Sequence, residues 1–489
     1  MNAVDIVIAN SLGITKSNKF IIHSPSRWSE SFSLPEKHFS YYPCFMGVLS
    51  SLLKTNTPLK VKMLDGCLLK LKKEEYLDNI LSLKPKYLFM EIASLVYKEN
   101  LELALEIKRL LGTKILFAGP HVSLHPEQAL KDGIDYVFKG EYEQSVLNFF
   151  ISNKHLMHEN GIFESQYFDF SNTPWPEDSD VSRMNYAIPG EPSSEYKEIQ
   201  IYASRGCIGK CSFCVARNIY YKNSFVRTRQ PHDVIKEMTY LKNKYPMLEG
   251  FFFDEEDHFA LQDFNNLLCN ELIKINNTMK IEAMGRIQSI PLHIIPKLKK
   301  AGYYKLRVGI ESFDEEVQKK IGKYIPRNQI EDFLYTCKNN NISVYATFQV
   351  GLSASSPSSD LFTLSIIKDY IMKDLISNVQ VSIYTPFPGT PDFQYLKDSK
   401  YLISENYEDY NGGEKSIIDR PEYSAKEVIN IYNRFLIMRD HINLVKKIKT
   451  KRVFKWILSK VRKYGLKKSM YKLRQRIQIE MQYLKINKK

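Results

Sequence analysis

The sequence lacks long hydrophobic runs and clustered cysteine pairs, and both absences exclude classes of protein. No apolar run reaches the roughly 18 residues that a membrane-spanning helix needs. The first residues lack the basic and apolar regions of a secretory signal peptide. Four of the seven cysteines are scattered, which favours free thiols in a reducing compartment over a disulfide framework. We therefore expect a cytoplasmic protein. The scattered cysteines are Cys44, Cys67, Cys269 and Cys337.

Acidic residues are nearly absent from the C-terminal end. Residues 441–489 contain 17 lysines and arginines and one acid, Glu480, so this tail carries a charge of +16. The whole chain of 489 residues carries +14, which leaves −2 for the rest. The positive charge is therefore a local appendage and not a general surface for nucleic acid.

The N-terminal part alternates between strand and helix patterns. Apolar runs at 4–10, 59–64, 87–92, 114–118 and 135–138 predict five strands, with helical spacing between them. One helix, 99–111, is followed by Gly112, a signal for a helix end. This alternation predicts an α/β fold with a doubly wound, Rossmann-like parallel sheet over residues 1–150, whose ligands bind at the carboxyl ends of the strands.

The remaining chain divides into three segments. Residues 151–195 are rich in turn-forming residues and predict a linker. Strand patterns then recur at 199–203, 250–254, 279–284, 304–309, 342–348 and 378–384, and each of the first five is followed by a helix pattern. Pro231 suits the first turn of one of these helices, and Gly302 closes another. Residues 396–489 predict a helical extension that ends in the basic tail.

Three cysteines form the most informative motif. Cys207, Cys211 and Cys214 follow the strand 199–203 with the spacing C-x3-C-x2-C. Three thiolates this close can bind three corners of a cubane iron–sulfur cluster and leave the fourth iron open. A structural zinc site would show two paired ligands here and two more elsewhere, and a ferredoxin would supply a fourth cysteine nearby. The alternative is that three core cysteines fall together by chance.

This loop, with Phe213 before the third cysteine, resembles the cluster-binding loop of the radical S-adenosylmethionine (radical SAM) enzymes. The resemblance implies a [4Fe-4S] cluster whose open iron chelates the amino and carboxylate groups of SAM. It implies reductive cleavage of SAM to methionine and a 5′-deoxyadenosyl radical, driven by an external electron donor such as flavodoxin or ferredoxin. It also implies that the six strand–helix units, residues 196–395, form a partial (β/α)6 barrel. Ile208 departs from the family pattern, which commonly has proline there.

The segment Gly309-Ile310-Glu311-Ser312 at the end of the fourth strand resembles the family segment whose acid, or its neighbour, holds the SAM ribose. Gly309, Glu311 and Ser312 are therefore candidate SAM-binding residues. The alternative is a helix start, with Ser312 as the N-cap and Glu315 as the third helical residue.

Two further strand ends carry candidate SAM contacts. Glu256 and Asp257, after the second strand, resemble the acidic pair of the family and could receive the SAM ammonium. Alternatively, they are a solvated helix N-terminus. Arg286, after the third strand, can pair with the SAM carboxylate through two hydrogen bonds, and its alternative role is a surface salt bridge. After the fifth strand, residues 351–356 lack the Gly-Leu-Pro-Gly-Glu sequence common in the family.

The N-terminal strand ends resemble a cobalamin-binding domain found in front of many radical SAM domains. A glycine–histidine segment follows the fourth strand and a glycine–glutamate segment the fifth. The turn at 385–391 resembles that of cobalamin-type radical SAM proteins. Alternatively, these glycines only make tight turns. The Asp-x-His-x-x-Gly motif is absent, so we expect no axial histidine from it. The implied cobalamin contacts are Ser94, Gly119, His121, Gly140 and Glu141.

These resemblances imply a cobalamin-dependent radical SAM enzyme that methylates an unactivated carbon of an unidentified substrate. Cyclisation or rearrangement, as in the anaerobic magnesium-protoporphyrin ester cyclase type, is an alternative on the same scaffold. Methylthiotransferases carry three further N-terminal cysteines, whereas only Cys44 and Cys67 lie there. A non-catalytic protein with a structural metal is a third possibility. The basic tail has the composition to contact a membrane surface, RNA or an acidic partner, or it is a solvated helix packed by its apolar stripe.

Overall fold

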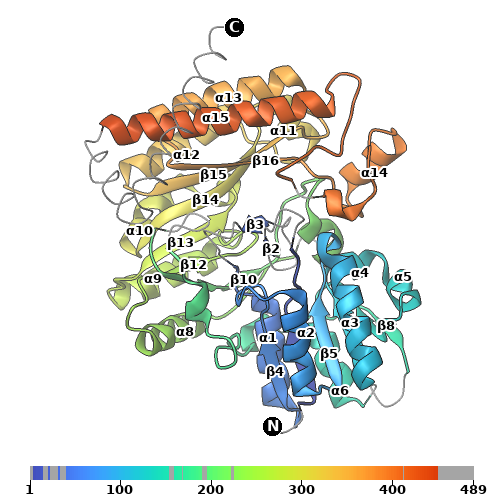
Figure 1. Ribbon diagram of the computed structural model, residues 1–489. Helices are drawn as coiled ribbons and strands as arrows, with labels where there is room; N and C mark the ends of the chain where they lie inside the picture. Colours follow the sequence, from blue (N-terminus) through green and yellow to red (C-terminus); the bar gives the residue numbers. More distant parts are fainter. Residues whose placement is uncertain are drawn as a thin grey trace, which may run out of the picture.

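The computed structural model describes residues 4–14, 20–22, 31–33, 40–153, 159–167, 169–189, 195–221, 225–410 and 412–449. Two parallel sheets with their helices make up most of this structure, the N-terminal one below and the second above it in Figure 1. No helix among the described residues is long and apolar enough to cross a membrane. Most of the predicted basic tail, from residue 450 onward, lies outside the described residues.

The N-terminal sheet has six parallel strands in the order β4-β1-β5-β6-β7-β8. The five predicted strands are confirmed. The sixth, β8, lies in the segment expected to be a linker, and its three residues are too few to show a periodic pattern. The strands are β1 (Ile6–Ala9), β4 (Val61–Leu64), β5 (Tyr87–Glu91), β6 (Lys114–Ala118), β7 (Tyr136–Phe138) and β8 (Gly161–Phe163).

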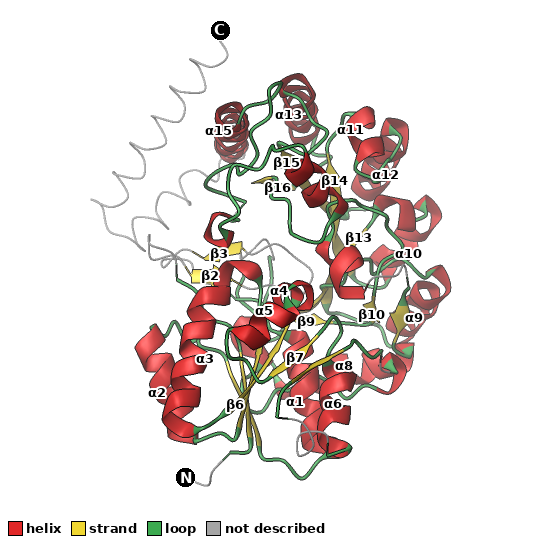
Figure 2. Cartoon of the chain, turned by 90° about the vertical axis from the view of Figure 1, so that its right-hand side faces the viewer, coloured by secondary structure: helices red, strands yellow, loops and turns green. Residues whose placement is uncertain are grey.

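Helices cover both faces of this sheet, with α2 (Lys73–Leu83) and α3 (Tyr97–Leu111) on one side and α1 (Cys44–Asn56) and α6 (Glu143–Ile151) on the other (Figure 2). Alternate strand residues feed the two cores: Ile8 and Phe89 pack with α1, and Leu88 with α3. Both faces are buried, and this explains why the strands read as continuous apolar runs. The predicted doubly wound sheet is confirmed.

The second sheet has six parallel strands in sequential order, and every predicted strand is present. Among the described residues, β9 and β16 form the two edges of this sheet and do not pair with each other, so the sheet forms an incomplete barrel. Pro231 occupies the first turn of α8, as predicted. The strands are β9 (Glu198–Ile201), β12 (Gly250–Phe253), β13 (Lys280–Gly285), β14 (Tyr303–Glu311), β15 (Ser343–Val350) and β16 (Asn378–Ile383). The main helices between them are α8 (Pro231–Lys244), α9 (Gln262–Lys274), α10 (Ile295–Lys300), α11 (Glu315–Lys320), α12 (Arg327–Asn339) and α13 (Pro357–Met372).

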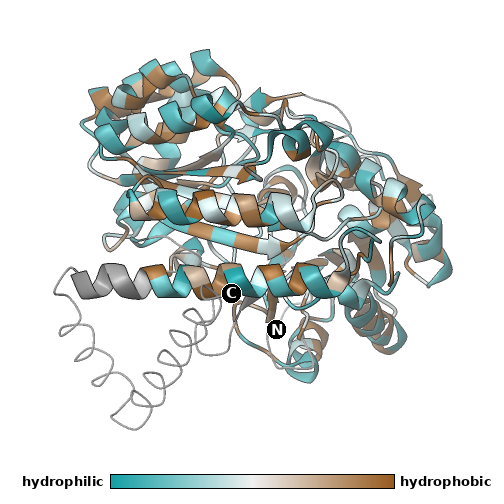
Figure 3. Ribbon diagram, turned by 90° about the horizontal axis from the view of Figure 1, so that it is seen from above, coloured by the Kyte–Doolittle hydropathy of each residue, from teal (hydrophilic) through white to brown (hydrophobic). Residues whose placement is uncertain are grey.

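The last described elements close the β16 side of the barrel. Helix α14 (Pro391–Asp398) is followed by the short η8 (Tyr407–Asp409) and by α15 (Ala425–Lys449), which packs on α13 and β16. Hydrophilic and hydrophobic residues alternate along α15 (Figure 3). Its buried side chains follow helical spacing, so one apolar stripe faces the barrel. They are Val428, Ile431, Phe435, Met438 and Ile442.

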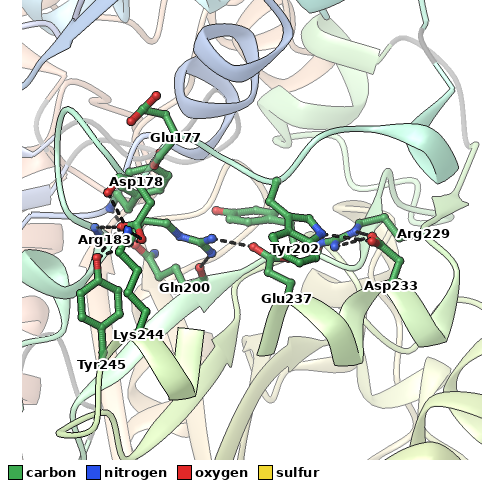
Figure 4. Close-up of polar contacts among 12 residues, drawn as sticks. Glu177, Asp178, Arg183, Gln200, Tyr202, Arg229, Asp233, Glu237, Lys244 and Tyr245 are labelled. Atoms are coloured by element: carbon green, nitrogen blue, oxygen red, sulfur yellow. Dashed lines mark hydrogen bonds and ion pairs between the residues drawn. The ribbon is translucent and has the colours of Figure 1, made fainter. Parts of the chain in front are cut away.

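A buried ionic network attaches the connecting segment to the barrel (Figure 4). Arg183 lies in η4 (Arg183–Tyr186) and donates to Glu237 Oε1 of α8 at 2.6 Å and to the Gln200 carbonyl of β9 at 2.7 Å. Arg229 also donates to Glu237 and to the Tyr202 carbonyl. Burial works to raise the pKa of Glu237, but the two guanidinium groups lower it overall. This network fixes the end of β9, from which the cysteine loop begins.

Substitution of Glu237 tests the energetic weight of this network. Glu237→Gln leaves Arg183 buried without a carboxylate partner, so we expect the free energy of unfolding to fall by about 3 kcal/mol. Glu316→Gln breaks an exposed pair with Lys319 and is the matched control, with a much smaller expected loss because solvent screens the pair. Urea unfolding of both variants measures the difference. Equal losses of unfolding free energy in the two variants would contradict the stabilising role of the buried network.

Candidate functional site

The three cysteines of the motif lie on the loop after β9, at the carboxyl end of the barrel sheet. Backbone contacts fix this loop against neighbouring segments: the Ser212 amide donates to the Ile321 carbonyl at 3.0 Å. The Asn218 side chain donates to the Cys214 carbonyl at 2.7 Å. Tyr220, just after the loop, stacks on Phe45 of α1 with ring centroids 5.9 Å apart. The loop therefore sits where the two sheets meet.

Gly206 sets the direction in which the chain enters the loop. Its φ is +99°, a conformation that side chains rarely adopt. A Cβ at this position would also overlap the Phe225 carbonyl oxygen. Only glycine fits both conditions.

The three cysteine residues of the loop are half-buried, and burial affects the protonation of Cys207 and Cys214. Burial raises the pKa of Cys207 to about 12, with a contribution from the charge of Asp257, and raises that of Cys214 to about 11. Metal binding must therefore displace protons from these thiols. Among the described residues, no three His, Cys, Asp or Glu side chains converge on one metal ion. A cubane cluster does not require such convergence, because each thiolate binds its own iron. The donor set fits a cluster held at three corners.

Two cationic side chains lie beside the cysteine loop. Arg286 approaches Gly209, with its Nε 3.5 Å from the position of a Cβ there, and this Nε is buried without a hydrogen-bond partner among the described residues. The Lys323 ammonium lies 2.7 Å from Glu311 Oε1. Burial works to lower the pKa of Lys323, but Glu311 and Cys211 raise it overall. A buried Nε without a partner among the described residues, on a half-buried guanidinium beside the cysteine loop, can donate to an anionic ligand. Lys323 belongs to no motif, so it could not be predicted as a site residue from the sequence.

Glu311 lies at an irregularity near the end of β14. The register with β15 shifts between Gly309 and Glu311, and Glu311 has φ +66°, an uncommon conformation for this residue type. A Cβ on Gly309 would overlap both the Glu311 carboxylate and the Lys323 ammonium. The glycine is therefore needed for the pair itself. The other Glu311 oxygen accepts from Gln349 Nε2 at 3.1 Å.

The side-chain contacts of Ser312 differ from those that the sequence predicted. Its hydroxyl is fully buried and lies 3.1 Å from Thr363 Oγ1. The N-cap of α11 is Asp314, whose carboxylate accepts from the amides of Glu316 and Val317. The alternative prediction of Ser312 as N-cap is therefore wrong, because the helix begins two residues later than the pattern suggested. Ser312 instead accepts from the Asp314 amide at 3.1 Å and supports the turn that follows Glu311.

The two acids after β12 have different partners: Glu256 contacts the start of the cysteine loop, and Asp257 contacts the segment after β13. Half-buried Glu256 accepts from the Gly206 amide and from the Tyr221 hydroxyl, both at 3.2 Å. Asp257 is fully buried and accepts from the Arg286 amide at 3.1 Å and the Ser289 hydroxyl at 2.6 Å. The alternative of a solvated helix N-terminus is wrong, because α9 begins only at Gln262.

Phe213 connects the cysteine loop to the last strand of the barrel sheet. Its ring meets Tyr384, just after β16, edge-on with centroids 6.5 Å apart. The residues of the predicted SAM site thus come from loops at the carboxyl ends of several barrel strands, the position where barrel enzymes carry their active sites.

The predicted cobalamin contacts Ser94 and His121 meet at the carboxyl ends of β5 and β6. Ser94 Oγ lies 3.0 Å from His121 Nδ1. Burial lowers the pKa of His121 to about 3, so the imidazole is neutral at physiological pH. Its ring packs 4.1 Å from Tyr97 and 5.1 Å from Tyr407 of η8, between centroids. The C-terminal extension therefore reaches the edge of the N-terminal sheet.

The two glycines of this edge approach the protein's own backbone. Gly119 has φ +100°, and a Cβ there would lie 2.7 Å from the backbone N and O of Ile92. Gly140 has φ +56°, and its Cβ would lie 2.9 Å from the Tyr220 carbonyl oxygen. Close turns account for both residues, as the alternative interpretation held.

Glu141 belongs to a buried ion cluster that joins the two sheets. Its carboxylate accepts from Arg205 at 3.0 Å and from Arg227 at 2.6 Å. Glu143 pairs with Arg205 at 2.6 Å, and burial raises the pKa of Glu143. The Arg205 guanidinium also lies over Phe45, 3.9 Å from the ring centroid. Because Arg205 directly precedes Gly206, the N-terminal domain holds the start of the cysteine loop. Sequence analysis missed this role, since the partners are distant in the chain.

Substitution of Gly206 tests whether the loop geometry governs metal loading. Gly206→Ala adds a side chain that overlaps the Phe225 carbonyl, so we expect at least a tenfold loss of iron after anaerobic reconstitution. Gly112→Ala is the matched control, because Gly112 also has positive φ but open space around it. Its cost is about 1–2 kcal/mol of stability, without loss of iron. Similar iron contents in both variants would contradict this account.

Comparisons with known proteins agree with this geometry. Residues 201–353 match the family model of the radical SAM superfamily. An uncharacterized methyltransferase of Pyrococcus horikoshii is 25% identical over 314 residues, 60% of this chain and 66% of the relative. The bacteriochlorophyllide d C-12(1)-methyltransferase of Chlorobaculum tepidum is 25% identical over 245 residues, 47% of this chain and 52% of the relative. The chain thus spans about half to two thirds of the length of these curated relatives.

Solved structures share the fold over both domains. The cobalamin-dependent radical SAM enzyme OxsB, with aqua-cobalamin bound, aligns with a TM-score of 0.68 at 13% identity, over 99% of this chain and 76% of OxsB. The radical SAM methyltransferase TsrM from Kitasatospora setae, with tryptophan and a SAM analogue, aligns with a TM-score of 0.61 at 16% identity, over 82% and 77%. We conclude that residues 201–353 match the radical SAM family model and that the chain shares the two-domain fold of OxsB and TsrM.

Proposed function

We propose that this protein is a cobalamin-dependent radical SAM enzyme that methylates an unactivated carbon of an unidentified substrate. The observation that carries the proposal is the cysteine loop, with Cys207, Cys211 and Cys214 at the carboxyl end of the barrel sheet and Arg286 beside them. Relatives named as methyltransferases, including both bacteriochlorophyllide enzymes of Chlorobaculum tepidum, support methyl transfer over cyclisation or rearrangement.

In this proposal each of the two sheets belongs to a domain with its own function. We assign residues 1–150, extended by β8, to a cobalamin-binding domain, 151–195 to the connecting segment, 196–395 to the radical SAM barrel and 396–489 to the C-terminal extension. All seven cysteines are free, which supports a cytoplasmic location.

The chain's own residues would hold the cluster and SAM as follows. The three cysteines would hold, as thiolates, three irons of a [4Fe-4S] cluster, which when bound would supply the electron for SAM cleavage. Arg286 offers donors to the SAM carboxylate, and half-buried Glu256 offers an acceptor to its ammonium. Glu311, held by Lys323 and Gln349, retains lone pairs that can accept from ribose hydroxyls.

Other predicted residues act from behind this group. Asp257 fixes the backbone of Arg286, and Ser312 supports the turn after Glu311. Gly309 leaves room for the Glu311–Lys323 pair, and Phe213 anchors the loop on Tyr384. These contacts hold the candidate ligand-binding side chains in fixed positions without exposing the supporting residues.

The carboxyl ends of β5 and β6 suit a large cofactor, because ligands of doubly wound sheets bind at this edge. We assign the neutral His121 and its partner Ser94 to the cobalamin site. When bound, methylcobalamin supplies the methyl group. Gly119 and Gly140 shape the turns of this edge, and Glu141 ties it to the cysteine loop.

Removal of one cluster ligand tests the proposal. We expect Cys211→Ala to lose the cluster and SAM cleavage, measured as iron content and as 5′-deoxyadenosine formed with dithionite. Cys337→Ala is the matched control, because Cys337 is a fully buried core residue of the same barrel. It should keep both properties at a cost of about 1 kcal/mol in stability. Cleavage of SAM by Cys211→Ala at the wild-type rate would refute the site.

A further inference from the structure

The outer surface of the cysteine loop carries exposed residues that the proposed chemistry does not use. We define the cluster-loop patch as Ile208, Lys210, Lys319, Lys320 and Tyr324. Ile208 and Lys210 lie between the first two cysteines, and both are exposed, Ile208 to 45%. The other three residues flank the turn after α11.

Backbone contacts bring the two parts of the patch together. The Ser212 amide of the cysteine loop donates to the Ile321 carbonyl at 3.0 Å. A Cβ on Gly322 would lie 2.5 Å from the Lys210 carbonyl oxygen, so this turn packs directly on the loop. The patch is therefore one continuous surface next to the cluster ligands.

The patch carries three lysines, and two acids lie beside them: Glu316 pairs with Lys319, and Glu315 accepts from the Tyr324 hydroxyl at 3.1 Å. Among the described residues, the unpaired positive charge is that of Lys210 and Lys320. Lys210 and Lys320 make no ion pair among the residues that the structure describes. Lys319 pairs with Glu316 at 2.7 Å, but both are exposed, so the pair contributes little. Lysines at the end of a helix also complement its dipole, which could explain Lys319 and Lys320. That explanation does not cover Lys210, which lies outside any helix.

The apolar part has the composition of a small interface. Ile208 and Tyr324 expose 45% and 40% of their surfaces beside these lysines. Apolar side chains within a charged rim are typical of protein–protein contacts, and electron-transfer encounters use interfaces at the small end of the range. Outside the basic tail the chain sums to −2, so the positive charge of the patch is local and not general.

We propose that the cluster-loop patch is the docking surface for an acidic one-electron carrier of the flavodoxin or ferredoxin class. This inference rests on the proposed function, because the electron is needed for SAM cleavage. The carrier is oxidised by one electron and the cluster is reduced by one. Opposite charges accelerate such encounters and make their rate fall with salt. Ile208 gives the carrier an apolar contact directly over the loop that holds the cluster.

Charge reversal tests this assignment. The variant Lys210→Glu/Lys320→Glu is loaded with cluster, and its oxidation of reduced flavodoxin is followed anaerobically at low and high salt. We expect at least a tenfold lower rate at low salt and a loss of the salt dependence. SAM cleavage with dithionite, which needs no docking, should stay at the wild-type rate. Lys300→Glu is the matched control. Lys300 is the last residue of α10 and precedes β14, so it lies at the amino end of that strand, whereas the cysteine loop lies at the carboxyl ends of the strands.

A second variant leaves the cysteine loop untouched. Lys319→Glu/Lys320→Glu should slow flavodoxin oxidation in the same direction, and it decides the outcome if the first variant loads iron poorly. Wild-type rates of flavodoxin oxidation in both variants, or an equal loss in Lys300→Glu, would overturn the docking surface. Failure of the wild-type protein to cleave SAM with dithionite would instead overturn the proposed function, so the two failures are distinguishable.

Discussion

The structure depends on a buried ion cluster at the junction of its two sheets. Arg205 is almost fully buried and pairs with Glu141 from the loop after β7 and with Glu143, the first residue of α6. Burying such charges costs several kcal/mol per ion unless each finds partners. Here two carboxylates and two guanidinium groups balance, since Arg227 completes the cluster. Because Arg205 directly precedes Gly206, the N-terminal domain positions the loop that carries the three cysteines.

The same loop is fixed from the barrel side. Glu256 accepts from the Gly206 amide, and Arg229 holds the carbonyl of Tyr202 at the end of β9. The loop is thus held by the N-terminal domain on one side and by the barrel on the other, and its side chains are positioned before any cofactor binds. Fixed positions of this kind reduce the cost of organising a site during catalysis. They also explain why a chain with a near-neutral body concentrates so many buried charges around one loop.

Sequence reasoning predicted the elements that depend on local pattern. Strands buried on both faces, such as β5 and β6, are recognisable as apolar runs. The spacing C-x3-C-x2-C by itself indicates an iron–sulfur cluster held by three thiolates. It missed what depends on distant partners: Lys323 beside Glu311, and Arg205 beside Glu141. The alternative role considered for Ser312, the N-cap of α11, is wrong: Ser312 and Glu315 have the spacing of a capping box, but Asp314 provides the cap. Strand β8 was too short to recognise.

Anaerobic reconstitution with iron, sulfide and hydroxocobalamin, followed by metal analysis, tests the central claim most directly. The account predicts about four irons and about one cobalt per chain, with the iron lost on substitution of Cys211 and the cobalt retained. Iron without cobalt would contradict the cobalamin site at the edge formed by Ser94 and His121, and with it methyl transfer from methylcobalamin. Absence of both metals would contradict the enzyme assignment itself.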